Sequence, residues 1–146
     1  MNKIMKEAGL TLVSIFVFAF LLNYVWESYH AVFLYEGHDF NAKKYVHMLT
    51  YVSMVDGVLI LGIYLILSVL WKNALWLQTM NSGQVWTAVV AGMSIAAAIE
   101  YRKVFVLKIW SYTPLMPTIF GIGVSPLFQL SVTGLASFWL TKRMLR

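Results

Sequence analysis

Long hydrophobic stretches alternate with short polar segments along the chain. Apolar residues dominate about 9–35, 46–71, 84–101 and 118–140. Each stretch is long enough to cross a hydrocarbon core of about 30 Å at about 1.5 Å per residue. Backbone groups in lipid must be hydrogen-bonded within the protein, so a helix is expected for each. The pattern predicts an all-α, polytopic membrane protein, with four transmembrane helices in an antiparallel bundle that forms a single domain over 1–146.

The segment 101–117 fits neither a fifth crossing nor a regular helix. It contains three basic residues and two prolines: Arg102, Lys103, Lys108, Pro114 and Pro117. Three buried cations would oppose insertion, and the prolines interrupt a helix. Trp110 and Tyr112 suit the membrane–water boundary. We therefore expect an interfacial segment that caps the bundle between the third and fourth helices.

The composition is typical of a membrane protein, and it limits the kinds of catalysis and metal binding that the chain can carry out. The chain is 60% hydrophobic and 12% charged, with a mean hydropathy of +0.73. The absence of cysteine excludes disulfides, thiolate catalysis and Cys-ligated metal sites. Three scattered histidines and the absence of a phosphate-binding loop lead us to expect no metal and no cofactor. The net charge of +5 lies mainly at segment ends, where it favours contact with the lipid bilayer and not with nucleic acid.

The distribution of basic residues also bears on orientation. Lys3 and Lys6 precede the first apolar run as in a signal peptide, but the run is long and has no small-residue cleavage site, so we expect a retained span. The side with both termini carries six Lys or Arg, against five on the other side. The basic tail favours cytoplasmic termini, in a bacterial inner membrane. The near balance leaves a dual-topology homo-oligomer open.

A carboxylate lies inside each of the first three stretches: Glu27, Asp56 and Glu100. An ionisable group in a membrane helix costs about 2.5–3.5 kcal/mol on insertion scales, so it usually faces a partner, a cavity or a substrate. Glu27 precedes the first loop, Asp56 follows it, and Glu100 ends the third stretch on that same side. Antiparallel helices therefore bring all three to similar depth, which predicts a polar pocket.

Other polar residues share the face of Glu27. Asn23, Glu27 and His30 are spaced by four and three residues, which places them on one side of a helix, with Trp26 beside them. A carboxylate one turn from a histidine can hold or relay a proton. The same residues could equally be structural, bonding each other or a neighbouring helix.

The two remaining acids have their own alternatives. Asp56 has no basic residue near it in an apolar span, and Gly57 would allow close approach of a helix or ligand. A protonated aspartate bonded to a backbone carbonyl would also explain it. Glu100 is followed by Arg102 and Lys103, so an interfacial ion pair is the alternative to a functional role.

The last stretch contributes a polar stripe. Gln129, Thr133 and Ser137 recur every four residues, on one face. We expect Pro126 to kink this helix near Gly121 and Gly123, which turns Gln129 inward at the depth of Asp56. The stripe could also serve only helix–helix packing.

Two short segments resemble motifs of membrane enzymes. Asn23-Tyr24-Val25-Trp26-Glu27 is similar to an N-x-x-W-E pattern of fungal membrane-bound terpene cyclases. The segment Trp110-Ser111-Tyr112-Thr113-Pro114, with the glycines and Pro126 beyond it, resembles heterodimeric lycopene cyclase domains. Both groups use intramembrane acids to protonate an isoprenoid olefin or epoxide, which implies Glu27 as an acid. Gln129 and its two predecessors stand where the lycopene cyclase pattern has acids, and the resemblance also fits small bacterial membrane proteins whose function it leaves open.

Three functions are consistent with these features. The first is acid–base catalysis, of the cyclase or isomerase type, on an apolar isoprenoid-like small molecule. Its catalytic candidates are Glu27, Asp56 and Glu100, and its substrate-binding candidates are Asn23, Trp26, His30, Trp110, Tyr112 and Gln129. The second is a homo-oligomeric, proton-coupled transporter or lipid-binding protein, and the third an accessory subunit of a membrane complex. An enzyme pocket should open sideways to lipid, whereas a transporter needs access to water on both sides.

Overall fold

Four helices make up most of the protein, which is 77% helical. The computed structural model describes residues 3–39 and 41–146. Helix α1 covers Lys3–Tyr29 and continues through a π-helical turn at His30–Leu34. Helix α2 covers Ala42–Leu70, and α3 covers Ser82–Tyr101 with a second π-helical turn at Arg102–Val106. Helix α4 covers Val124–Met144.

Three of these helices are long and apolar enough to cross a membrane: Met5–Leu34, Ala42–Leu70 and Ser82–Val106. This finding indicates a membrane protein and agrees with the first three predicted spans. Helix α4 carries the polar stripe and is less apolar, so a fourth crossing stays a prediction.

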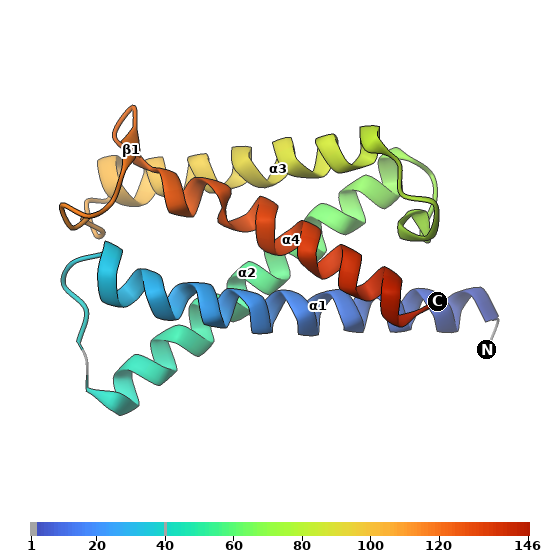
Figure 1. The fold of residues 1–146 in the computed structure, drawn as a ribbon, viewed down its shortest axis with the longest axis horizontal. Helices are drawn as coiled ribbons and strands as arrows, with labels where there is room; N and C mark the ends of the chain where they lie inside the picture. The colour runs from blue at the N-terminus through green and yellow to red at the C-terminus, as the bar shows by residue number, and fades with distance from the viewer. Residues whose placement is uncertain (1–2, 40) are drawn as a thin grey trace.

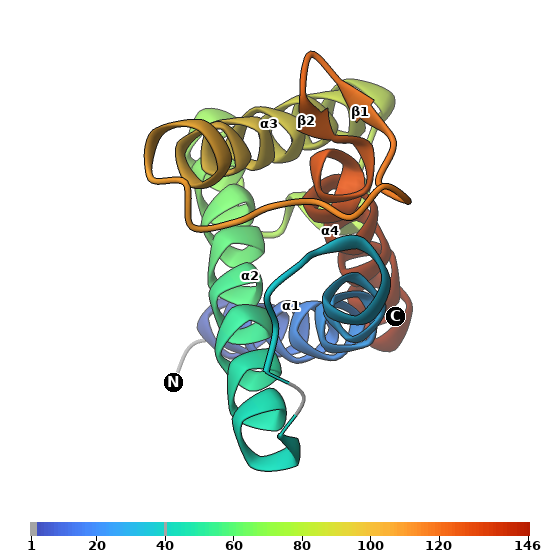
Figure 2. The same ribbon diagram turned by 90° about the vertical axis from the view of Figure 1, so that its left-hand side faces the viewer.

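Successive helices run in opposite directions and enclose a central space. In Figure 1, α1 and α3 run from side to side. Helix α2 starts below α1 and passes behind it up to the start of α3, whereas α4 runs in front, from the level of α3 down to that of α1. Viewed from the end, α1 lies below, α3 above, and α2 and α4 form the two flanks (Figure 2). Helices α2 and α3 meet near their short connection and diverge toward the opposite end in both views. The diverging end is the one where α1 and α3 finish and α4 begins.

The start of α4 differs from the expectation. Residues expected to begin the helix form a hairpin instead, with β1 at Thr118–Ile119 and β2 at Ile122–Gly123. The turn needs left-handed backbone at Phe120 and Gly121, with φ of 52° and 77°. Pro126 consequently lies in the first turn of α4, where its missing N–H would have no helical partner. The expected start at residue 118 and the expected kink are therefore wrong.

The loops at this end of the molecule are held together by hydrogen bonds. The Glu36 amide donates to Ser111 O at 3.0 Å, and the Thr113 amide donates to Leu34 O at 3.0 Å. The Thr113 hydroxyl donates to Phe33 O at 2.7 Å. The segment after α3 thus returns across the end of α1, which confirms the expected cap; its place at a membrane interface stays a prediction.

The opposite end is filled by aromatic side chains. The rings of Tyr64, Trp76 and Phe138 pack with centroids 5.5–6.0 Å apart, and all three are buried. The Tyr64 hydroxyl donates to Ala74 O and so ties the loop after α2 to the core. Nearer the middle, a Cβ on Gly92 would lie 2.7 Å from the Ser131 hydroxyl oxygen, so α3 and α4 approach closely there.

Candidate functional site

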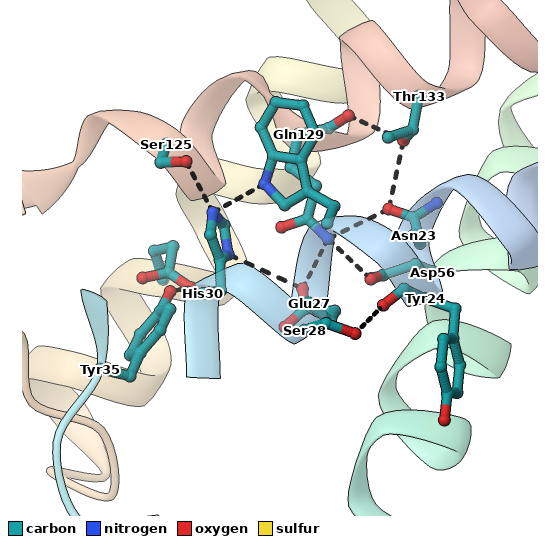
Figure 3. Close-up of polar contacts among 12 residues, drawn as sticks. Asn23, Tyr24, Glu27, Ser28, His30, Tyr35, Asp56, Ser125, Gln129 and Thr133 are labelled. Carbon is teal, nitrogen blue, oxygen red and sulfur yellow. Dashed lines mark hydrogen bonds and ion pairs between the residues drawn. The ribbon is translucent and has the colours of Figure 1, made fainter. Parts of the chain in front are cut away.

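Gln129 is the centre of the polar cluster. Its Nε2 lies 2.6 Å from Glu27 Oε1, 3.0 Å from Asp56 Oδ2 and 3.0 Å from Asn23 Oδ1 (Figure 3). Three helices, α1, α2 and α4, thus direct polar side chains at one point. The expectation that Glu27 and Asp56 converge, with Gln129 at the same depth, is confirmed.

The cluster has fewer hydrogen-bond donors than acceptors at Gln129. An amide nitrogen carries two N–H donors, yet three oxygens contact Gln129 Nε2. The reversed amide would place an acceptor among three acceptors, so the nitrogen is the atom that fits here. A proton on either carboxyl group would supply a third donor. Two carboxylates sharing one site favour a single proton between them.

Asn23 and Thr133 hold the cluster from the inner side. Asn23 is fully buried, and its Nδ2 donates to Ala19 O at 2.8 Å. Its Oδ1 therefore faces Gln129 and the Thr133 hydroxyl, which lies 3.2 Å away. Ser137 bonds back to Thr133 O at 2.6 Å and lies outside the cluster. The predicted stripe thus divides into two residues at the site and one that only satisfies its own helix.

His30 lies one turn from Glu27 with a defined tautomer. Trp26 Nε1 is 2.7 Å from His30 Nε2, and the Ser125 hydroxyl oxygen is 2.6 Å from the same atom (Figure 3). The indole is only a donor, so Nε2 accepts and the neutral ring carries its proton on Nδ1. Among the described residues Nδ1 has no hydrogen-bond partner, and it lies 3.9 Å from Glu27 Oε1. Trp26 therefore orients a histidine N–H toward the acid.

A cavity of about 390 Å³ connects the acidic residues. Glu27, Asp56, Glu100 and Gln129 all line it, together with apolar side chains from α2, α3 and α4. Tyr51 and Val55 also line it and are 65% and 40% exposed, so the cavity reaches the molecular surface along α2. The cavity is lined from both α2 and α3, by Val55 and Ile99 among others, and we assign its opening to the space between these two helices.

Glu100 is less exposed to solvent than the other two acids and is engaged differently. Its carboxylate accepts hydrogen bonds from Tyr35 at 3.0 Å and from Tyr112, and it is 3% exposed. Tyr112 also accepts from the Gly123 amide at 3.1 Å. Burial, and then the Glu100 carboxylate, raise the pKa of both tyrosines, which remain donors throughout the physiological range. These contacts join the ends of α1, α3 and α4, and the alternative of an ion pair with Arg102 or Lys103 does not occur in the described residues.

The predicted site residues thus fall into three groups. Asn23, Glu27, Asp56 and Gln129 form one cluster, and Trp26 and His30 adjoin it. Glu100 and Tyr112 form the closure at the loop end, where Trp110 also lines the cavity. Three contributors were not predicted: Tyr35, His38 and Ser125. Each lies in or beside a loop. The residue type alone does not show which residue, far away in the sequence, such a side chain contacts.

A metal site has no support in the described residues. Across 3–39 and 41–146 no three His, Asp or Glu side chains gather closely enough to hold an ion.

The loop after α1 holds two residues with a shifted pKa. Burial lowers the pKa of the His38 imidazole. A hydrogen bond from Lys44, at 2.8 Å, lowers the pKa of the exposed Asp39 carboxyl group.

Comparison with known proteins adds nothing to this geometry: no family model, no curated protein and no solved structure matches the chain. The resemblance to isoprenoid cyclases therefore stays an expectation.

Proposed function

We propose that the protein is an intramembrane acid–base enzyme that acts on an apolar, isoprenoid-like olefin, with Glu27 and Asp56 as the proton-exchanging groups. One observation carries the proposal: two carboxyl groups from different helices share one amide donor inside a largely apolar, laterally open cavity. All four helices cross the bilayer as an antiparallel bundle, with both termini in the cytoplasm of a bacterium.

The pair can carry out both halves of an olefin rearrangement. The neutral carboxylic acid gives its proton to one alkene carbon; the alkene electron pair forms the C–H bond and leaves a cation on the other carbon. The partner carboxylate then removes a proton from a neighbouring carbon, whose C–H electrons restore a double bond. The product is an isomer, or a ring if a second alkene first attacks the cation. The proton is then on the partner carboxyl group, and its transfer back to the first one regenerates the enzyme.

The surroundings support this chemistry. Gln129 holds both carboxyl groups, and His30 presents an N–H toward Glu27. Tyr51 and Trp110 line the cavity, and aromatic faces attract a cationic intermediate. Apolar walls keep water away from the cation, which would otherwise be captured as an alcohol.

The access route favours an enzyme over a transporter. The loop end is closed by the hydrogen bonds of Tyr35 and Tyr112 to Glu100, and the other end by the packed rings of Tyr64, Trp76 and Phe138. A lipid-soluble substrate can enter between α2 and α3 without crossing either closed end.

Deuterium transfer from solvent tests the proposal. Purified protein in vesicles is incubated in D₂O with a neutral isoprenoid extract, and carbon-bound deuterium is measured by mass spectrometry after exchange back into H₂O. Wild type and the exposed-acid control Asp39→Asn should label a discrete lipid. Asp56→Asn should reduce labelling by about 100-fold or more, because general acid–base catalysis typically contributes that much. Equal labelling by Asp56→Asn, or none by wild type, would contradict the proposal.

A second candidate is a proton-coupled carrier, and one observation favours it. A groove of about 420 Å³ between α1 and α4 is lined by Trp26, His30 and Ser125. His30 therefore lies between this groove and Glu27, as a proton relay would. Acidification of vesicles that depends on an added apolar ligand, and that is lost in His30→Gln, would select this function.

A further inference from the structure

The chemical character of the cavity changes along its length. Its inner end holds Glu27, Asp56 and Gln129, whereas its outer end is lined by His38, Lys103 and Trp110. Glu100 also lines this outer end, where its carboxylate accepts hydrogen bonds from two tyrosine hydroxyls. Along α3, Ala96 and Lys103 line the cavity seven residues apart, which corresponds to about 10 Å. The wall between the two ends is apolar and includes Val52, Val55 and Ile99. A molecule that fills the cavity therefore meets two carboxyl groups at one end, an apolar middle, and a lysine at the other end beside a carboxylate that tyrosines already bind.

Lys103 is the distinctive residue of the outer end. It is half-buried, and its Nζ lies 5.4 Å from the centroid of the Trp110 ring. In the described part of the chain no carboxylate lies within ion-pair distance of it. Glu100, one turn away on the same helix face, is instead occupied by two tyrosine hydroxyls. An ammonium group held beside a cavity without a counter-ion is suited to binding an anion.

Lys103 is one of several basic residues at the loop end of the molecule. Four further basic residues lie at this end of the molecule: Lys43, Lys44, Arg102 and Lys108. Within 3–39 and 41–146, Lys44 is the one of these four that forms an ion pair, with Asp39 at 2.8 Å. Burial lowers the pKa of His38, so its imidazole is neutral at pH 7 and offers a hydrogen bond without a charge. Among the described residues that line the cavity, Lys103 is therefore the one that carries a positive charge.

We propose that the ligand of this cavity is an amphipathic lipid with an anionic, phosphate-type headgroup, bound at Lys103 and His38. Its chain follows Val52, Val55 and Ile99 inward to the Asp56 carboxyl group and leaves through the opening between α2 and α3. The inference deepens the proposed function by assigning a substrate class, and it rests on that function only for the reaction at the inner end.

Binding of three probes tests the headgroup assignment. Farnesyl phosphate, farnesol and inorganic phosphate are titrated by calorimetry against the full-length protein in an uncharged detergent. Lys103→Gln is compared with Arg102→Gln, which removes the same charge one residue away from an exposed side chain that does not line the cavity. We expect Lys103→Gln to weaken farnesyl phosphate binding about tenfold or more, which is the effect of losing about 1.4 kcal/mol. Arg102→Gln should change it less than threefold, and farnesol binding should be unchanged in both.

Each alternative outcome has a definite meaning. Farnesyl phosphate binding that is equal in wild type and Lys103→Gln overturns the proposal, as does farnesol binding more tightly than its phosphate. Lys103-dependent binding of inorganic phosphate, with no added affinity from the farnesyl chain, identifies a soluble anion and overturns the lipid assignment. If wild type binds farnesyl phosphate through Lys103 but no lipid is deuterated in D₂O, the proposed function fails while this inference stands. If neutral lipids are deuterated equally by wild type and Lys103→Gln, this inference fails while the proposed function stands.

Discussion

The same four helices build two ends of very different character. At the end with both termini, Tyr64, Trp76 and Phe138 fill the interior ring against ring. At the loop end, α2 and α3 separate, and the interior holds three carboxyl groups, an amide and a cavity. Ring packing at one end can stabilise the fold. The other end can therefore hold buried polar groups, although burying them costs free energy. The difference predicts that mutations at the two ends will separate stability from activity.

The largest expected loss of stability comes from the packed end. Phe138→Ala removes a ring that is 1% exposed and contacts both Tyr64 and Trp76. Truncation of a buried phenylalanine typically lowers the free energy of unfolding by about 3–5 kcal/mol. Phe128→Ala, on the same helix but 40% exposed, is the matched control and should cost far less. Thermal unfolding in detergent measures both; equal losses would contradict the assignment of the core.

Gln129→Leu is expected to have the next largest effect, because it acts inside the cluster. It leaves three oxygens, from Asn23, Glu27 and Asp56, without their shared donor. Unsatisfied buried polar groups cost about 1–3 kcal/mol, so unfolding should be easier by that amount. Gln78→Leu makes the same change at an exposed position. If both variants unfold alike, Gln129 does not hold the cluster together.

Tyr112→Phe should produce a smaller, local effect. The change removes one hydroxyl donor to Glu100 and should cost about 0.5–1.5 kcal/mol. Hydrogen exchange should then accelerate in residues 107–117 and not in α2. Tyr101→Phe, 57% exposed, should leave exchange unchanged. Uniform acceleration through all helices would show that Tyr112 contributes to global stability instead of local closure.

The same closure should respond to alkaline pH with a defined sign. Burial, with Glu100 adding to it, raises the pKa of Tyr35 and Tyr112 above the ordinary value of 10.0. Because folding holds these protons more tightly, their contribution to stability is complete below pH 10 and declines above it. Wild type should therefore lose more stability between pH 9 and about 11 than the double variant Tyr35→Phe, Tyr112→Phe. Parallel losses would argue against protonated tyrosines at Glu100.

The smallest effect is expected at Ser53. Its hydroxyl is buried and has no hydrogen-bond partner among the described residues, so Ser53→Ala should be neutral or slightly stabilising. Ser131→Ala breaks a 2.8 Å bond to Val89 O and should cost about 0.5–1.5 kcal/mol. Chemical denaturation in detergent compares the pair; a larger loss at Ser53 would mean that its hydroxyl has a partner.

The helices and the polar cluster could be predicted because they depend on length and periodicity. Four apolar stretches gave four helices, and counting residues from the first loop placed Asp56 beside Glu27. The start of α4 could not be found in this way, since the hairpin over 118–123 is as apolar as a helix. Its left-handed turn at Phe120 and Gly121 has no hydropathy signal.

The closure at the loop end was also beyond sequence reasoning. Tyr35 and Glu100 are separated by 65 residues, and their hydrogen bond depends on how two loops return across the helix ends. Nor does the sequence specify that Trp26 donates to His30 and thereby fixes its tautomer. Such contacts depend on side-chain direction, which helical periodicity constrains only within one element.

The central claim, that the cavity binds a lipid-soluble ligand entering between α2 and α3, is tested most directly by native mass spectrometry of protein in mild detergent. Val55→Trp places a large ring at the opening, and Val58→Trp makes the same change on α2 at a position that is 59% exposed and does not line the cavity. The account predicts a discrete lipid adduct on wild type and Val58→Trp that is lost from Val55→Trp. An adduct of equal abundance on all three proteins, or none on wild type, would contradict it.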